Sequence, residues 1–278
     1  MFPSKNRAAY GGNRGTGKIA ESFGWDEEVA VEFDIPLVDT YCDSISNLLK
    51  RLVATQRAEL ATAQNWVADT LAAGGLIYVT GSGHSHMIAE EVFYRAGGIA
   101  AVQAILEPPL MLHQGAHRST VLERLEGYAE IVLGDYPIGR DDVLFVASNS
   151  GRNAFPIEAA LFGRANGAKV IAITSRDHAA RVASRHSSGK MLSDVADLTI
   201  DNQAPYGDAC LAIPNSDQWM GSASTISGAF IVNAVMAEAV ANLSRRGVVV
   251  DVYRSANAAG GSDATDIVER WRSRIRGL

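Results

Sequence analysis

The stretch that decides the fold is Val143-Leu144-Phe145-Val146-Ala147-Ser148-Asn149-Ser150-Gly151-Arg152-Asn153. It joins a continuous apolar run to a polar turn that contains a glycine. The run lacks the alternating polar positions of a half-exposed strand, which indicates a strand buried on both faces. Strands of this kind are typical of a parallel sheet that helices cover on both sides.

The same order of apolar run, polar turn and helical segment recurs elsewhere in the chain. The other runs and their turns are 76–79 before Gly81-Ser82-Gly83-His84-Ser85, 170–173 before Thr174-Ser175, and 196–200 before Asp201-Asn202. The segments between the runs are long enough for right-handed crossover helices. We therefore predict a doubly wound α/β fold of the flavodoxin-like kind, with a mainly parallel five-stranded sheet and helices on both faces.

The chain divides into three predicted parts. These are an N-terminal arm over residues 1–36 that we expect to be flexible, a folded domain over 37–247, and a C-terminal extension over 248–278 with a short helix. Within the domain, apolar residues at helical spacing predict one long helix over 38–73, which Gly74-Gly75 ends. A last helix is predicted over about 224–243.

The composition excludes several classes of partner. The net charge is −6 over 278 residues, whereas double-stranded nucleic acid requires a basic face. No apolar run approaches the roughly 20 residues that cross a bilayer. Cys42 and Cys210 are far apart and lack metal-ligand spacing, which fits a reducing cytoplasm. We expect a cytoplasmic protein that binds neither nucleic acid nor a membrane.

Two glycine-rich segments only partly match nucleotide-binding motifs. Gly81-Ser82-Gly83 begins like a dinucleotide fingerprint, but His86 stands where the third glycine belongs. Gly12, Gly17 and Lys18 have the spacing of a P-loop, but Ile19 replaces the serine or threonine that binds magnesium. We therefore predict no cofactor.

The turn at Ser148-Asn149-Ser150-Gly151 favours an anion site. It opens a helix, so free backbone N–H groups and the positive end of the helix dipole face any ligand there. Three side chains that donate hydrogen bonds surround these amides, and Arg152 and Asn153 follow in the first helical turn. A helix cap would need only one serine. The cluster of donors suits a phosphate monoester, with its several acceptor oxygens.

These motifs together resemble the SIS (sugar isomerase) family of sugar-phosphate isomerases and sugar-phosphate-binding proteins. The resemblance rests on a Gly-x-Gly-x-Ser turn, a Ser-x-Ser-Gly-x-Asn turn and a strand that ends in Thr-Ser, and it covers about residues 38–245. The stretches 81–98 and 149–158 are similar to a subfamily often labelled phosphoheptose isomerase-like. The resemblance, with the chemistry of neighbouring side chains, predicts substrate contacts from Ser82, His84, Ser85, Arg95, Ser148, Asn149, Ser150, Arg152, Asn153, Thr174 and Ser175.

Aldose–ketose isomerisation needs a base that moves a proton between C1 and C2 through an enediolate. The candidates are Glu91, His113 and His186. Glu91 and Arg95 are four residues apart on a predicted helix and so share a face, although a surface ion pair has the same spacing. In phosphoheptose isomerases the corresponding positions carry a zinc-binding His and Glu, which this sequence lacks, so we predict no metal. Thr225 stands where hexulose-phosphate isomerases have a catalytic Glu.

His186 belongs to a cationic segment, 178–190, that follows a strand end. Such a segment would close over an anionic sugar, or it is a solvated loop. The sequence thus predicts an isomerase of a sugar phosphate or a similarly anionic sugar, such as a sulfosugar. The alternatives are a SIS-type lyase that cleaves an ether of an amino sugar phosphate and a non-catalytic sensing module. Family members pair subunits through helices, so the resemblance implies a homodimer or homotetramer with shared sites.

Overall fold

The computed structural model describes residues 18–19, 31–32, 35–255 and 265–278. The central sheet has five strands in the order β4-β3-β5-β6-β7, and every neighbouring pair is parallel. This confirms the predicted doubly wound α/β fold. The strands are β3 (Ile77–Gly81), β4 (Val102–Ala104), β5 (Val143–Ala147), β6 (Lys169–Thr174) and β7 (Leu198–Asp201).

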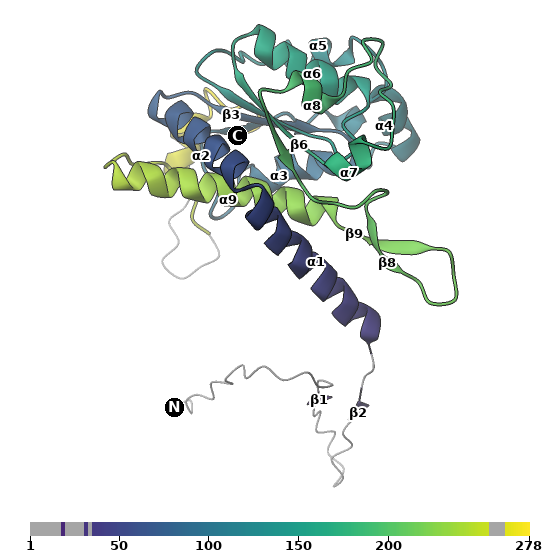
Figure 1. Cartoon of the computed structure of the whole chain (residues 1–278). Coiled ribbons are helices and arrows are strands. Elements are labelled where there is room, and N and C mark those ends of the chain that lie inside the picture. The colour runs from purple at the N-terminus through teal and green to yellow at the C-terminus, as the bar shows by residue number, and fades with distance from the viewer. Residues whose placement is uncertain (1–17, 20–30, 33–34, 256–264) are drawn as a thin grey trace, which may run out of the picture.

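Helices cover both faces of the sheet (Figure 1). One face is covered by α2 (Arg57–Ala72), α3 (Met87–Val92) and α9 (Ser224–Arg245). The other is covered by α5 (Tyr128–Leu133), α6 (Ala154–Ala165) and α8 (Leu192–Val195). Short helices between these elements are η1 (Gly83–His86), η2 (Pro108–Leu110), α4 (Ala116–Leu122) and α7 (Arg176–Ala179). The apolar strands are therefore buried on both sides, as their continuous runs predict.

The predicted single helix over 38–73 is wrong in one respect, because the chain forms two helices there. α1 (Pro36–Thr55) ends before Gln56, and α2 starts at Arg57. Gln56 is 7% exposed, and its side-chain oxygen accepts a hydrogen bond from the N–H of Asp201 at the end of β7. This contact anchors the break at the sheet, and the N-terminal half of α1 projects from the body (Figure 1).

The long helix α9 fulfils the prediction of a last helix. By length and composition it is the one helix in the described part of the chain that could cross a membrane, and 44% of its most apolar window is buried. It packs on α2 and α3, as a core helix does. At Gly228 an added Cβ would lie 2.8 Å from the end of the Ile88 side chain, so a larger residue there would force Ile88 of α3 to move.

The C-terminal extension returns to the edge of the sheet. Val252 pairs with Ile99 just before β4, and Ile275 is buried. The predicted short helix is α10 (Thr265–Trp271). A hairpin, β8 (Ala209–Ala212) with β9 (Trp219–Ser222), precedes α9, and β1 (Lys18–Ile19) pairs with β2 (Val31–Glu32). Most of the predicted arm, including the P-loop-like glycines, lies outside the described residues.

Candidate functional site

The strand order reverses between β3 and β5. β4 follows β3 in the chain and lies on one side of it, whereas β5 lies on the other. Such a reversal opens a crevice beyond the carboxyl ends of the two strands, where doubly wound proteins bind ligands. The turns after β3 and β5, predicted as ligand-binding from the sequence, border this crevice.

The turn after β5 precedes α6 rather than forming its first turn. α6 begins at Ala154 with Asn153 at the N-cap, so the prediction that Arg152 and Asn153 lie within the helix is wrong by a few residues. Gly151 has φ +62°, and a Cβ there would lie 3.0 Å from the hydroxyl oxygen of Thr174. The tight turn at Gly151 leads the chain from the end of β5 into the N-terminus of α6.

A small pocket lies between this turn, the first turn and the N-terminus of α9. α9 begins beside it at Ser224, so the positive end of the α9 dipole faces the pocket, and the turn that contributes Ser148 and Asn149 leads on into α6. The pocket is lined by Ser85, Ile88, Ala147, Ser148, Asn149, Ile173, Asn202, Ser224, Thr225 and Gly228. We call these residues and the turn 148–153 the cradle.

Several donors of the cradle have no partner within the described chain. The hydroxyl groups of Ser85, Ser150 and Thr225 make no hydrogen bond there. Asn149 accepts a hydrogen bond at its Oδ1 from Nδ2 of Asn202 (3.0 Å), which orients the Asn149 side chain and leaves its own N–H groups as donors. Unpaired donors near a helix N-terminus are suited to an anion.

Other predicted contacts fix the turns in place. Ser82 donates to Oε2 of Glu123 (2.8 Å) and Thr174 donates to the backbone oxygen of Asn149 (3.2 Å). Ser175 is fully buried, donates to the backbone oxygen of Ala204 (2.6 Å) and caps α7. Their hydroxyl groups are already used, so these residues position the cradle, and their contact with a ligand stays a prediction.

Three polar pocket residues, Asn202, Ser224 and Thr225, were not predicted as site residues. Asn202 follows the apolar run of β7, so its place at a strand end was a usable signal. Ser224 is placed by a distant residue, because Asp208 accepts hydrogen bonds from the N–H groups of Ala223 and Ser224 and from the Ser224 hydroxyl (2.8 Å). Asp208 thus fastens the start of α9 to the pocket, a contact that sequence spacing does not reveal.

The candidate bases lie apart from one another. α3 ends at Val92, so Arg95 is not on the same helix as Glu91, although the two side chains are paired. Asn233 of α9 donates to the same carboxylate (2.8 Å), away from the pocket lining. His113 is exposed beside the first turn. The pKa of His86 in that turn is lowered, chiefly by burial; the charge of Glu90 opposes this effect, and that of His113 adds to it. His84 is exposed as well.

Sequence comparison identifies relatives of this chain. A UPF0309 protein from Halalkalibacterium halodurans is 44% identical over 220 residues, which cover 79% of this chain and 91% of the relative. Another from Geobacillus thermodenitrificans is 41% identical over 240 residues, with 86% and 96% covered. The chain belongs to the UPF0309 family.

This UPF0309 member also contains a SIS domain, which confirms the predicted family. The SIS domain matches residues 40–175, a range that contains β3, β5, β6 and both turns of the cradle. The structure of phosphoheptose isomerase from Neisseria gonorrhoeae is similar, with a TM-score of 0.50, 16% identity, and 73% of this chain and 97% of that chain covered. At this identity the likeness bears on the fold alone.

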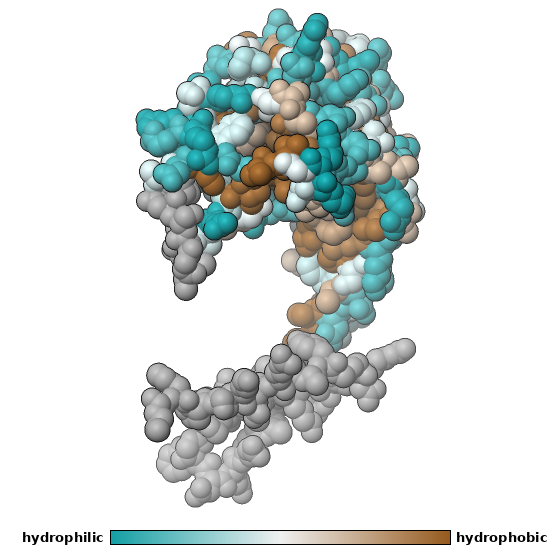
Figure 2. Space-filling view, turned by 90° about the vertical axis from the view of Figure 1, so that its left-hand side faces the viewer, coloured by the Kyte–Doolittle hydropathy of each residue, from teal (hydrophilic) through white to brown (hydrophobic). Residues whose placement is uncertain are grey.

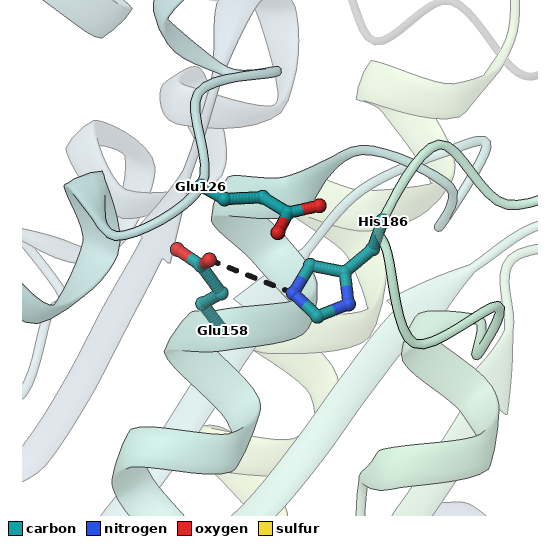
Figure 3. Close-up of side chains that lie close together, drawn as sticks. All are labelled: Glu126, Glu158 and His186. Carbon is teal, nitrogen blue, oxygen red and sulfur yellow. Dashed lines mark ion pairs between the residues drawn. The ribbon is translucent and has the colours of Figure 1, made fainter.

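The third candidate base, His186, points toward two carboxylates in this UPF0309 member (Figure 3). Nε2 of His186 lies 3.5 Å from Oε1 of Glu158 on α6, and Glu126 reaches the same cluster from the loop after α4. Glu126 accepts hydrogen bonds from the N–H (2.6 Å) and hydroxyl (2.7 Å) of Ser187. We call Glu126, Glu158 and His186 the clasp, because they tie the loop 184–190 to the body.

The clasp is also the group of described side chains that could hold a metal ion. Its ligand atoms all lie within 4.8 Å of one another, and imidazole with carboxylate suits zinc or manganese. Both oxygens of Glu158 accept the N–H of Gly127 (2.8 and 2.9 Å), and both oxygens of Glu126 are bound to Ser187. Hydrogen bonding therefore accounts for the cluster without an ion.

The clasp predicts an acid-sensitive loop. Hydrogen bonds from the Ser187 hydroxyl and then its N–H lower the pKa of Glu126 below the usual 4.5. A carboxyl group with a lower pKa in the closed loop stabilises closure above its ordinary pKa, and this stabilisation is lost as the pH falls through the lowered value. As the pH falls below 4.5, hydrogen-exchange protection of residues 187–190 should therefore decrease relative to that of β5. Glu126→Gln should abolish this dependence; equal pH profiles in both proteins would contradict the role of Glu126.

Proposed function

We propose that the cradle binds the phosphate, or a similar anionic group, of a sugar. The observation that supports this most directly is the set of unpaired side-chain donors beside the N-terminus of α9 at the strand-order reversal. A phosphate monoester offers enough acceptor oxygens for the hydroxyl groups of Ser85, Ser150 and Thr225 and for the amide of Asn149. The SIS domain supports the same ligand class.

We further propose that the bound sugar is isomerised between its aldose and ketose forms. A base would remove the proton beside the carbonyl, the cradle would hold the phosphate and so fix the sugar chain, and the proton would return to the neighbouring carbon. His113 is the candidate base that we would test first, because its neighbour Leu112 reaches the first turn, 4.0 Å from the Cβ position of Gly83. A lyase would begin with the same proton removal but would release a fragment.

A second candidate is binding without turnover. The residues that line the pocket include no carboxylate, imidazole, amine or thiol, so the described pocket by itself lacks an acid–base group. A sensing module needs none. Transfer of deuterium from D2O into a sugar phosphate, followed by NMR, separates the candidates. Deuterium in an otherwise intact sugar favours the isomerase, and loss of a fragment favours the lyase. No exchange favours the sensor.

The proposed homodimer or homotetramer has a candidate surface on α1, α2 and α9. A groove there is lined by Val53, Arg57, Leu60, Ala61, Gln64, Phe230, Ala234, Val235 and Glu238. Figure 2 shows hydrophobic residues both on the body and along the projecting helix. Ile35, Leu37 and Val38 at the start of α1 are 52%, 36% and 59% exposed. α9 contributes residues both to this groove and to the pocket of the cradle. A partner subunit that covers the groove would therefore lie along the helix that a shared site uses.

Ser150→Ala tests the cradle. The Ser150 hydroxyl has no partner among the described residues, so its removal should leave the fold unchanged. One lost hydrogen bond to a charged group should weaken binding of glucose 6-phosphate by about tenfold. The measurement is a calorimetric titration, with a thermal-shift screen of other phosphorylated and sulfonated sugars before it.

Ser244→Ala is the matched control. Ser244 is exposed near the far end of α9, and 20 helical residues span about 30 Å, so this variant should bind like the unaltered protein. If no anionic sugar binds to the unaltered protein, or if Ser150→Ala binds as tightly, the cradle proposal is wrong.

A further inference from the structure

Three arginines from separate segments lie around the N-terminus of α6. Arg152 belongs to the cradle turn, Arg124 follows α4, and Arg185 lies in the loop that the clasp fastens. The N–H of Arg185 donates to the backbone oxygen of Arg152 (2.8 Å). The N–H of Phe155 in α6 donates to the backbone oxygen of Glu123, next to Arg124 (3.0 Å). Backbone contacts therefore hold all three segments at this one place.

The three side chains also share an environment. The guanidinium of Arg185 donates to Oδ1 of Asn153 (3.0 Å), which directs it to the edge of the cradle. Burial, and then the positive charges of Arg124 and Arg152, lower the pKa of Arg185. Burial and then the charge of Arg152 also lower the pKa of His178. Repulsion among these positive charges opposes the close approach of the three side chains unless an anion is bound.

No carboxylate in the described part of the chain forms an ion pair with Arg124, Arg152 or Arg185. Glu123 is near Arg185, but its carboxylate already accepts the hydroxyl of Ser82. The Nε of Arg152 is buried and has no hydrogen-bond partner. An unpaired arginine on a surface is ordinary, but a buried donor without a partner costs free energy. Here it lies within a cluster of like charges.

The cradle and the arginines differ in chemistry. The unpaired side-chain donors of the pocket are neutral hydroxyl and amide groups, which with the dipole of α9 suffice for one phosphate. Guanidinium groups bind carboxylate or phosphate through paired N–H donors, and their charge favours a further anionic group. We propose that Arg124, Arg152 and Arg185 form a second anion subsite beside the cradle, and that the ligand is a sugar with two anionic groups. This inference rests on the proposed function of the cradle.

Calorimetric titration with three related ligands tests the subsite. Glucose 6-phosphate has one anionic group, whereas glucose 1,6-bisphosphate and 6-phosphogluconate add a phosphate and a carboxylate. At constant ionic strength, at least one of the latter two should bind about tenfold more tightly than glucose 6-phosphate. Which of them does so identifies the second group. Arg124→Gln, an exposed position, should reduce this preference toward equal binding.

Arg272→Gln is the control, because it removes the same charge from the segment just after α10, where Arg272 pairs with Glu269. It should keep the preference of the unaltered protein. Equal binding of all three ligands by the unaltered protein overturns the second subsite and leaves the cradle intact. An Arg124→Gln variant that weakens all three ligands by one factor also overturns it, since the arginine would then hold the cradle phosphate. If none of the three ligands and no inorganic phosphate binds, the proposed function fails as well.

Discussion

Phe145→Ala is expected to lower the free energy of unfolding by about 4 kcal/mol. Phe145 is fully buried in β5, which pairs with β3 on one side and β6 on the other. Removal of its ring deletes apolar contact area and leaves a cavity that the surrounding strands cannot fill by moving, because they are hydrogen-bonded on both edges. The effect is therefore near the upper end for a core substitution.

Urea unfolding followed by circular dichroism measures this change. Phe145→Leu is the matched variant: it keeps a large apolar side chain and should cost only about 1–2 kcal/mol. A loss below about 1 kcal/mol for Phe145→Ala would mean that the centre of the sheet relaxes freely, which contradicts the close packing between α6 and the sheet.

Gly81→Ala is expected to abolish sugar-phosphate binding. Gly81 ends β3 opposite Ala147, and a Cβ there would lie 2.5 Å from the backbone oxygen of Ser85 and 3.0 Å from that of Ala147. Both atoms belong to the backbone, so they cannot swing aside as a flexible side chain could. The first turn must shift and take Ser85 away from the pocket. Overpacking of this kind costs about 3 kcal/mol of stability in addition.

Gly139→Ala separates this effect from a general response to an added methyl group. At Gly139 the nearest atom to a new Cβ is 3.9 Å away, so neither stability nor binding should change. The measurement is a glucose 6-phosphate titration of both variants together with their unfolding curves. Full binding by Gly81→Ala would show that the first turn does not contribute to the site.

The strands that sequence analysis located are those with long continuous apolar runs. β3, β5 and β6 each coincide with such a run, and β7 with a shorter one that Thr199 interrupts; each of the four leads into a recognisable polar turn. β4 has only three residues, Val102–Ala104, within an alanine-rich stretch, so its pattern does not differ from that of a buried helix segment. The hairpin β8–β9 was not predicted, because the apolar run of β8 is short and β9 is polar in part and mostly exposed.

Local spacing could not predict contacts between distant residues. The turn 148–153 was found because its donors are consecutive in the sequence. The break at Gln56, by contrast, depends on β7, and the start of α9 depends on Asp208. Arg124 has no motif around it and meets Arg185 only through the folded backbone. Such contacts join residues tens of positions apart, and a single sequence does not encode them in any short pattern.

The strand order has a consequence for synthesis. β3 pairs with β4 shortly after both are made, but its other edge waits for β5, since Ile77 pairs with Val143, 66 residues later. A ribosome that adds about 5–20 residues per second needs roughly 3–13 s to reach that point. For that time the edge of β3 that will pair with β5 is unpaired in the nascent chain. The anion pocket needs the ends of both strands, so a ribosome-bound chain that stops before Ala147 has the first turn but no place for a phosphate.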